Sequence, residues 1–191
     1  MIDDLTISEH LIDHLLLHAC CAPCSSAIVE WLLNNNIRPT IFYYNPNIFP
    51  QAEYEISKNE RKRHAHSLGI NWVDGDYEHE AWLCHIDGYQ SQPERGARCQ
   101  LCFDMRLLKT AVKAKELGIE CFATTLASSR WKSLDQINSA GMAAEQAVAG
   151  TQFWARNWRK GGLQERRNKL LKEYGFYNQQ YCGCEFSIRA E

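Results

Sequence analysis

The sequence predicts an α/β protein with a parallel sheet and a helical C-terminal part. Short apolar runs alternate with helical patterns up to about residue 130, and from about residue 131 the pattern is helical and polar. Strands that alternate with helices in this way are typical of βαβ units, which build parallel sheets. A chain of 191 residues fits one domain, residues 1–191, with a sheet core at about 15–130 and a basic helical part at about 131–191.

Four runs have the composition of buried strands, and helical patterns lie between them. The strands are predicted at residues 15–19, 40–44, 71–74 and 120–126. The intervening helices are predicted at residues 25–34, 51–68 and 101–117. Gly118 follows the last of these helices, in the position that commonly caps a helix C-terminus.

Cysteine, asparagine and serine residues follow the predicted strands directly. Ligands of open parallel sheets bind beyond the carboxyl ends of the strands. We therefore expect the segments after the four strands to meet at one edge of the sheet and to carry the chemistry. These segments are residues 20–24, 45–47, 74–77 and 128–129.

The overall charge does not indicate nucleic-acid binding. The formal net charge is −2, so any such binding must come from a local patch. One candidate is a basic stretch interleaved with aromatic residues, as in surfaces that bind single-stranded or loop RNA. The other interpretation is a solvated helix face with aromatic residues in the core. The stretch contains Phe153, Trp154, Arg156, Trp158, Arg159, Lys160, Arg166, Arg167, Lys169, Lys172, Tyr174 and Tyr177.

The cellular compartment is expected to be the cytoplasm. The first residues show no signal-peptide pattern, and the apolar runs are too short to span a membrane. Thiols stay reduced in the cytoplasm, so nine cysteines favour metal or redox chemistry over structural disulfides.

Six of the nine cysteines form three close pairs, and a seventh, Cys24, lies beside the first pair. A fold that gathers the pairs makes a sulfur-rich pocket suited to an iron–sulfur cluster, iron or zinc, which the C-terminal part would close. A structural zinc site needs four ligands. Six or seven thiols therefore favour a cluster with a second metal, or a cluster with reactive thiols. The pairs are Cys20-Cys21, Cys99-x-x-Cys102, just ahead of a predicted helix, and Cys182-x-Cys184.

The remaining cysteines and histidines have simpler interpretations. Cys84 and Cys121 stand alone in the sequence and are expected to be small buried residues. His18 ends the first predicted strand and is expected to pack there. The other histidines follow no zinc-protease spacing.

Five motifs carry a resemblance to a known family. They are His18-Ala-Cys-Cys-Ala-Pro-Cys24, Tyr44-Asn-Pro-Asn-Ile48 with Glu53-Tyr54, Pro93-Glu-Arg-Gly-Ala-Arg-Cys-Gln-Leu-Cys-Phe-Asp-Met-Arg-Leu107, Thr124-Thr-Leu126 with residues 128–132, and Tyr181-Cys-Gly-Cys-Glu-Phe-Ser187. In this order they make the chain resemble the QueH-type epoxyqueuosine reductases over about residues 15–187.

The resemblance implies the last step of queuosine synthesis on tRNA, in a Rossmann-like α/β fold of the HUP or PP-loop type. The partners would be tRNA with a GUN-type anticodon carrying epoxyqueuosine and an external electron donor such as ferredoxin or flavodoxin. It implies a 4Fe–4S cluster and an adjacent mononuclear metal, expected to be iron. The division of ligands between the two centres stays open, and Cys24 is a weaker candidate. The implied ligands are Cys20, Cys21, Cys99, Cys102, Cys182 and Cys184.

Four other residues are candidates for contact with the substrate. Asp104 is the candidate proton donor, although a carboxylate near a helix N-terminus is also explained by the helix dipole. Asn45 and Asn47 are candidates to hydrogen-bond the hydroxylated cyclopentane ring, and Tyr54 to stack on the base.

Two other functions are alternatives. A tRNA-thiolation enzyme of the PP-loop class needs a Ser-Gly-Gly-x-Asp-Ser phosphate loop after the first strand, where this chain has residues 20–24 instead. A zinc-binding RNA adaptor would be colourless and would have no redox activity.

Overall fold

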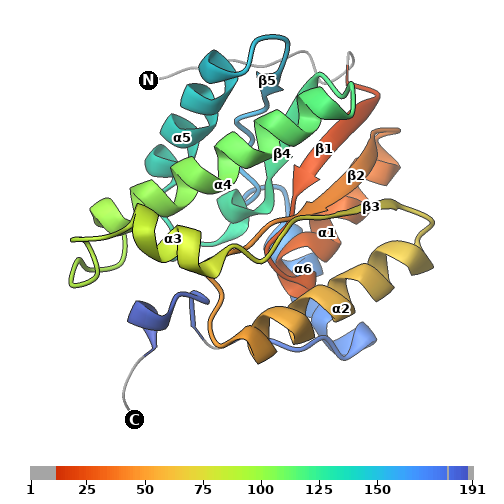
Figure 1. Ribbon diagram of the computed structural model, residues 1–191. Coiled ribbons are helices and arrows are strands. Elements are labelled where there is room, and N and C mark those ends of the chain that lie inside the picture. Colours follow the sequence, from red (N-terminus) through yellow and green to blue (C-terminus); the bar gives the residue numbers. More distant parts are fainter. Residues whose placement is uncertain (1–11, 180, 189–191) are drawn as a thin grey trace.

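A computed structural model describes residues 12–179 and 181–188 of the chain. Five strands form one sheet in the order β3-β2-β1-β4-β5, and every neighbouring pair is parallel (Figure 1). The predicted α/β fold with a parallel sheet is therefore confirmed. The strands are β1 (His14–His18), β2 (Arg38–Tyr43), β3 (Asn71–Asp74), β4 (Cys121–Thr124) and β5 (Gln152–Phe153).

The central strand β1 is covered on both faces. Leu15, Leu16 and Leu17 have no exposed surface, and β1 pairs with β2 on one side and β4 on the other. A strand buried on both faces is apolar at consecutive positions rather than at alternate ones. This is why the apolar runs predicted the inner strands well.

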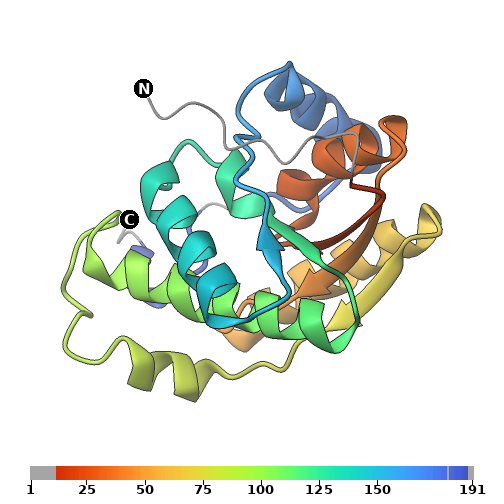
Figure 2. The same ribbon diagram turned by 90° about the horizontal axis from the view of Figure 1, so that it is seen from above.

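Helices cover both faces of the sheet. Figure 2 shows α1 and α6 on one side, with α4 and α5 on the other. Helix α1 also contacts α2, and α3 packs on α4. The helices are α1 (Ala22–Asn34), α2 (Gln51–Ser67), α3 (His79–His85), α4 (Ala97–Glu116), α5 (Leu134–Ala147) and α6 (Leu163–Tyr174).

Two helices begin earlier than predicted, and both starts involve cysteines. Helix α1 begins at Ala22, with Cys21 in the extended N-cap position and Pro23 in the first turn, where proline is favoured. Helix α4 begins at Ala97 after Gly96. The prediction that the Cys99 pair lies ahead of this helix was therefore wrong, because the pair lies within its first two turns.

The C-terminal part is not wholly helical. Strand β5 has only two residues and pairs with β4, so the sheet continues past residue 130. Strand β4 is shorter than predicted because the Thr124 hydroxyl accepts the N–H of Leu126 and starts a short 3₁₀ helix, Thr125–Ser128.

The aromatic residues at the start of the basic and aromatic stretch belong to the core. Phe153, Trp154 and Trp158 are buried, and the guanidinium of Arg156 lies 4.0 Å from the ring centroid of Trp31. Arg166 pairs with Glu30 on α1. For these residues the structure favours packing over RNA contact, whereas Tyr174 and Tyr177 are exposed. Across the described residues, no helix combines the length and apolar character needed to cross a membrane.

Candidate metal centre

Three cysteines meet where β1 ends and α1 begins. Cys20 follows the strand, Cys21 is the N-cap of the helix, and Cys24 lies in its first turn. Their sulfur atoms all lie within 4.8 Å of one another, and the Cys20 and Cys21 Sγ atoms are 3.9 Å apart. We call these residues the N-terminal cysteine group. Three converging thiols form a natural set of ligands for one soft metal ion.

Contacts among the three thiols shift their pKa values in opposite directions. Thiol hydrogen bonds from Cys21 and Cys24 hold the pKa of Cys20 well below its ordinary value. The contact with Cys20 raises the pKa of Cys21, and it raises that of Cys24 to about 12. The start of α1 also favours a thiolate through the helix dipole. Of the three thiols, Cys20 is therefore the one whose surroundings most favour the thiolate form.

Four further cysteines line a second site, a small cavity of about 20 Å³. Cys99 and Cys102 lie one turn apart on α4, and Cys182 and Cys184 come from the C-terminal segment. We call these four residues the distal cysteine group. Sets of four cysteine thiols bind iron–sulfur clusters in some proteins and zinc in others.

Gly183 allows the C-terminal segment to present both of its sulfurs. Its φ of +98° lies in the region that favours glycine, and an added Cβ would lie 3.1 Å from Ile48 Cγ1. The carbonyl of Gly183 accepts the N–H of Phe49 at 2.8 Å, which attaches the segment to the loop after β2.

The N–H donors around the distal group suit an iron–sulfur cluster, whereas the amide oxygen of Asn47, an acceptor, does not bear on it. Trp82 Nε1, Arg106 Nε and Asn47 Oδ1 belong to residues that line the cavity, and these buried atoms have no hydrogen-bond partner among the described residues. Cluster sulfurs accept hydrogen bonds from N–H groups, and four thiolates leave the cluster negatively charged. The unpaired N–H donors and the guanidinium groups of Arg98 and Arg106 meet both needs.

Arg106 links the distal group to the N-terminal group. Its Nη1 contacts Cys102 Sγ at 3.8 Å, and its Nη2 donates to Asn45 Oδ1. Asn45 Nδ2 in turn donates to the carbonyl of Ala19 at 2.9 Å. A chain of contacts through Arg106 and Asn45 therefore connects the two cysteine groups.

Lys132 lies near both cysteine groups. Burial by itself would lower the pKa of Lys132, but electrostatic attraction to Cys182, Cys20 and Cys24 outweighs burial and raises it. A lysine in this place keeps its positive charge and offsets the negative charge of the thiolates.

His18 packs under the site as a neutral residue, which confirms the prediction for it. Its Nε2 must donate to the carbonyl of Tyr44 at 3.0 Å, so its Nδ1 accepts from the Thr124 hydroxyl at 2.8 Å. Burial, together with the charge of Arg106, lowers the pKa of His18 to about 3.

The predicted substrate contacts lie in different surroundings. Asn47 lines the distal cavity, whereas both polar atoms of the Asn45 side chain already have protein partners. Tyr54 is buried between Tyr43 and Tyr77, so stacking on a base would require this aromatic cluster to open. Asp104 accepts a hydrogen bond from Gln100 and does not line the cavity.

Sequence reasoning underrated Cys24 and did not single out Trp82 or Arg106. The segment Cys21-Ala-Pro-Cys24 is itself a Cys-x-x-Cys pair, with a proline that favours a helix start, and this signal marks Cys24 as an equal member of its group. Of the two lone cysteines, Cys121 is buried as predicted, but the prediction for Cys84 was wrong because it is exposed.

Comparison with known proteins identifies the family. The model of the family described as "Epoxyqueuosine reductase QueH" matches residues 15–190. A Histophilus somni protein with the same name is 45% identical over 175 residues, which are 92% of this chain and 72% of that protein. The protein of Acinetobacter baylyi is 44% identical over 177 residues, 93% of this chain and 81% of its own length.

The match to a more distant relative spans almost the whole length of that relative. The Thermotoga maritima protein named epoxyqueuosine reductase QueH is 35% identical over 177 residues, 91% of this chain and 90% of the relative. These matches do not favour the zinc adaptor or the thiolation enzyme. The chain belongs to the QueH family of epoxyqueuosine reductases and is an oxidoreductase.

Proposed function

We propose that this chain reduces the epoxide of epoxyqueuosine, at the wobble position of tRNA with a GUN-type anticodon, to the alkene of queuosine. Both carbon–oxygen bonds of the epoxide break, and two electrons and two protons convert its oxygen to water. The observation that carries the proposal is the gathering of seven cysteines into two linked groups at one edge of the sheet. The relatives named epoxyqueuosine reductase support the choice of substrate.

The two groups divide the cysteines between two metal centres. We assign Cys99, Cys102, Cys182 and Cys184 to a 4Fe–4S cluster, because these four line one cavity with unpaired N–H donors beside it. We assign the N-terminal cysteine group to the second metal, expected to be iron. When bound, the cluster supplies electrons one at a time, and a metal with an open position supplies a Lewis acid for the epoxide oxygen.

Residues of the chain hold the site and orient the substrate. Arg106 and Asn45 fix the spacing of the two groups through their buried hydrogen bonds. The unpaired amide oxygen of Asn47 makes it the better of the two asparagines to accept a hydrogen bond from a ring hydroxyl. Tyr54 supports the loop that follows β3, because its hydroxyl donates a hydrogen bond to the carbonyl of Gly75.

The proton donor and the electron donor complete the proposal. Asp104 is the candidate acid, with its carboxylate oriented by Gln100. Electrons come from a ferredoxin or flavodoxin. Asp104→Asn tests the acid: it should slow formation of queuosine without changing the metal content, whereas unchanged turnover would exclude Asp104.

The decisive experiment measures metal and product together. The protein is purified without oxygen and reconstituted with iron and sulfide. It is then incubated with reductant and tRNA that contains epoxyqueuosine. We expect brown protein with about five irons and four sulfides per chain, and queuosine among the nucleosides resolved by mass spectrometry. Cys84→Ser, at an exposed cysteine outside both groups, is the matched control. A colourless protein that holds zinc alone would refute the proposal and favour the RNA adaptor.

A further inference from the structure

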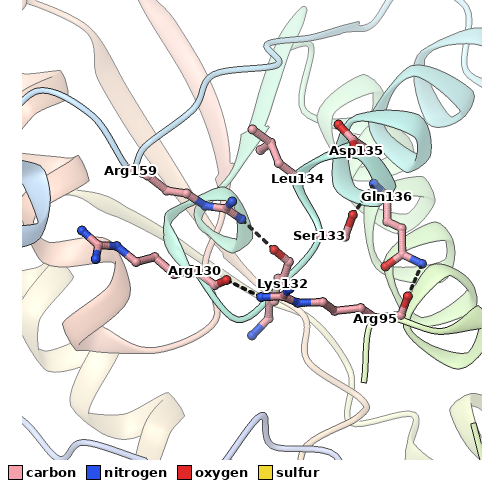
Figure 3. A pocket seen from close by; sticks show the side chains of 8 residues that line it. All are labelled: Arg95, Arg130, Lys132, Ser133, Leu134, Asp135, Gln136 and Arg159. Atoms are coloured by element: carbon pink, nitrogen blue, oxygen red, sulfur yellow. Dashed lines mark hydrogen bonds between the residues drawn. The ribbon is translucent and has the colours of Figure 1, made fainter. Parts of the chain in front are cut away.

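A cationic hollow of about 470 Å³ lies beside the cysteine site (Figure 3). Its size is within the range of pockets that bind small organic groups. Four lining residues are basic, and Asp135 is the single carboxylate among them. The chain as a whole has a net charge of −2, so this concentration of positive charge is local. The hollow is lined by Arg95, Arg130, Lys132, Ser133, Leu134, Asp135, Gln136 and Arg159.

Two arginines hold the segment of residues 130–132 in place. Arg95 donates from Nη2 to the carbonyl of Arg130 at 2.7 Å and from Nε to that of Trp131 at 3.0 Å. Arg159 donates from Nη2 to the carbonyl of Lys132 at 2.8 Å, and its buried Nε has no partner among the described residues. Figure 3 shows both guanidinium groups turned towards this segment. These bonds fix the backbone of residues 130–132, from which two of the basic side chains of the hollow extend.

Among the described residues, the basic groups of the hollow form no ion pairs, although the carboxylate of Asp135 interacts with Arg159 at longer range. In residues 12–179 and 181–188, no ion pair involves Arg95, Arg130, Lys132 or Arg159. The N-terminus of α5 also borders the hollow, where Ser133 caps the helix. The N-terminus of a helix attracts anions. Both features point to an anionic ligand.

Trp131 does not line the hollow, but it lies in the chain between two residues that do, Arg130 and Lys132. Its side chain is 75% exposed, more than any other large apolar side chain in the described part of the chain. Exposed aromatic rings beside a cationic groove are the usual means of binding unpaired nucleotides, because every base has a face on which a ring can stack. A docking surface for a folded protein would not require a hollow of this kind.

The hollow adjoins the distal cysteine group. The backbone N–H of Arg95 contacts Cys99 Sγ at 3.3 Å, and Lys132 lies near cysteines of both groups. We propose that the hollow is the subsite for the nucleotide next to epoxyqueuosine in the anticodon loop: Arg130, Lys132 and Arg159 bind its phosphate, and Trp131 stacks on its base. The inference rests on the proposed function and specifies how the RNA is held.

The test separates the phosphate contact from the stacking contact. Holoprotein is titrated into a fluorescein-labelled anticodon stem-loop RNA without epoxyqueuosine, over a series of salt concentrations. Arg130→Ala should weaken binding and make the slope of log K against log salt smaller by about 0.7, the value for one phosphate on a single strand. Trp131→Ala should weaken binding at least about fivefold without changing this slope, and Trp131→Phe should restore most of the affinity.

Arg63→Ala, at an exposed arginine on α2, is the matched control for loss of one charge and should bind like the parent. Parental affinity and slope in Arg130→Ala and Trp131→Ala would overturn the inference. So would normal RNA binding together with slower reduction of the protein by a flavodoxin, because the hollow would then be a site for the electron donor.

The binding assay does not depend on turnover. If the parent protein makes queuosine while both variants bind RNA normally, the subsite is wrong and the proposed function stands. If the variants lose affinity as expected but the parent makes no queuosine, the subsite for RNA stands and the reductase function fails.

Discussion

Arg106 donates a buried hydrogen bond to Asn45, and this contact joins the two cysteine groups. Both side chains are almost completely buried. Arg106 lies on α4, where its guanidinium also contacts Cys102. Asn45 in turn donates to the carbonyl of Ala19, the residue before Cys20. A polar bridge therefore connects the two cysteine groups.

Replacing Arg106 should weaken the fold. Arg106→Met leaves the amide oxygen of Asn45 buried without a donor, which costs about 1–3 kcal/mol of unfolding free energy. Urea unfolding, followed by circular dichroism under anaerobic conditions, measures the change. Arg63→Met, at an exposed site, is the control. Equal midpoints for Arg106→Met and the parent would show that the bridge contributes nothing to stability.

Removing Cys24 should affect one metal centre and spare the other. Cys24→Ser removes one thiol of the N-terminal group but leaves the four thiols of the distal cavity intact. Iron should fall from about five to about four per chain, while the brown absorbance and the sulfide content stay at parental values. Iron and sulfide assays give the answer. Loss of the brown colour would instead place Cys24 at the cluster.

Trp82 should tune the reduction potential of the cluster. Its unpaired Nε1 lies in the lining of the distal cavity, where an N–H donor to sulfur stabilises the more negative, reduced state. Trp82→Phe should therefore shift the potential to a more negative value while the brown colour is kept. A spectroelectrochemical titration measures the shift.

The control for Trp82 is another buried tryptophan. Trp158 also has an unpaired Nε1, but it packs against Trp31 and Trp154 in the main core. Trp158→Phe should leave the potential unchanged. A shift of the same size in both variants would mean that loss of packing, and not loss of an N–H donor near the cluster, changes the potential.

The buried imidazole of His64 should lower the free energy of unfolding in mild acid. Burial, together with the charge of Arg61, lowers the pKa of His64 from 6.5 to about 4. Below pH 6.5 the unfolded chain therefore binds a proton that the folded chain refuses until about pH 4. Stability falls across this interval as the pH decreases, by about 1 kcal/mol between pH 7 and pH 5.5.

His64→Gln removes this titration and keeps an acceptor for Arg61, so its stability should depend less on pH than that of the parent. Urea midpoints at several pH values test the difference. His66→Gln is the control, since His66 is an exposed imidazole on the same helix. A change in slope of equal size at His66 would contradict a role for burial of His64.

Local chemistry explains which parts of the fold could be predicted. The apolar segments of β1 and β2 are buried on both faces and were recognised as continuous runs. Strand β5 was missed because two residues give no pattern, and Phe153 belongs to the sheet only because it pairs with β4. The start of α4 was placed too late because nothing in the sequence fixes Gly96 as its N-cap.

The sequence by itself determined the parallel α/β fold class and the family, because strand composition and cysteine spacing are local properties. It could not divide the cysteines into two groups, pair Arg106 with Asn45 or reveal the hollow beside Trp131. These features join segments far apart in the chain, such as α4 with the residues after Tyr181. The rotation of each helix and the path of each loop decide which side chains meet, and those are fixed only when the whole core packs.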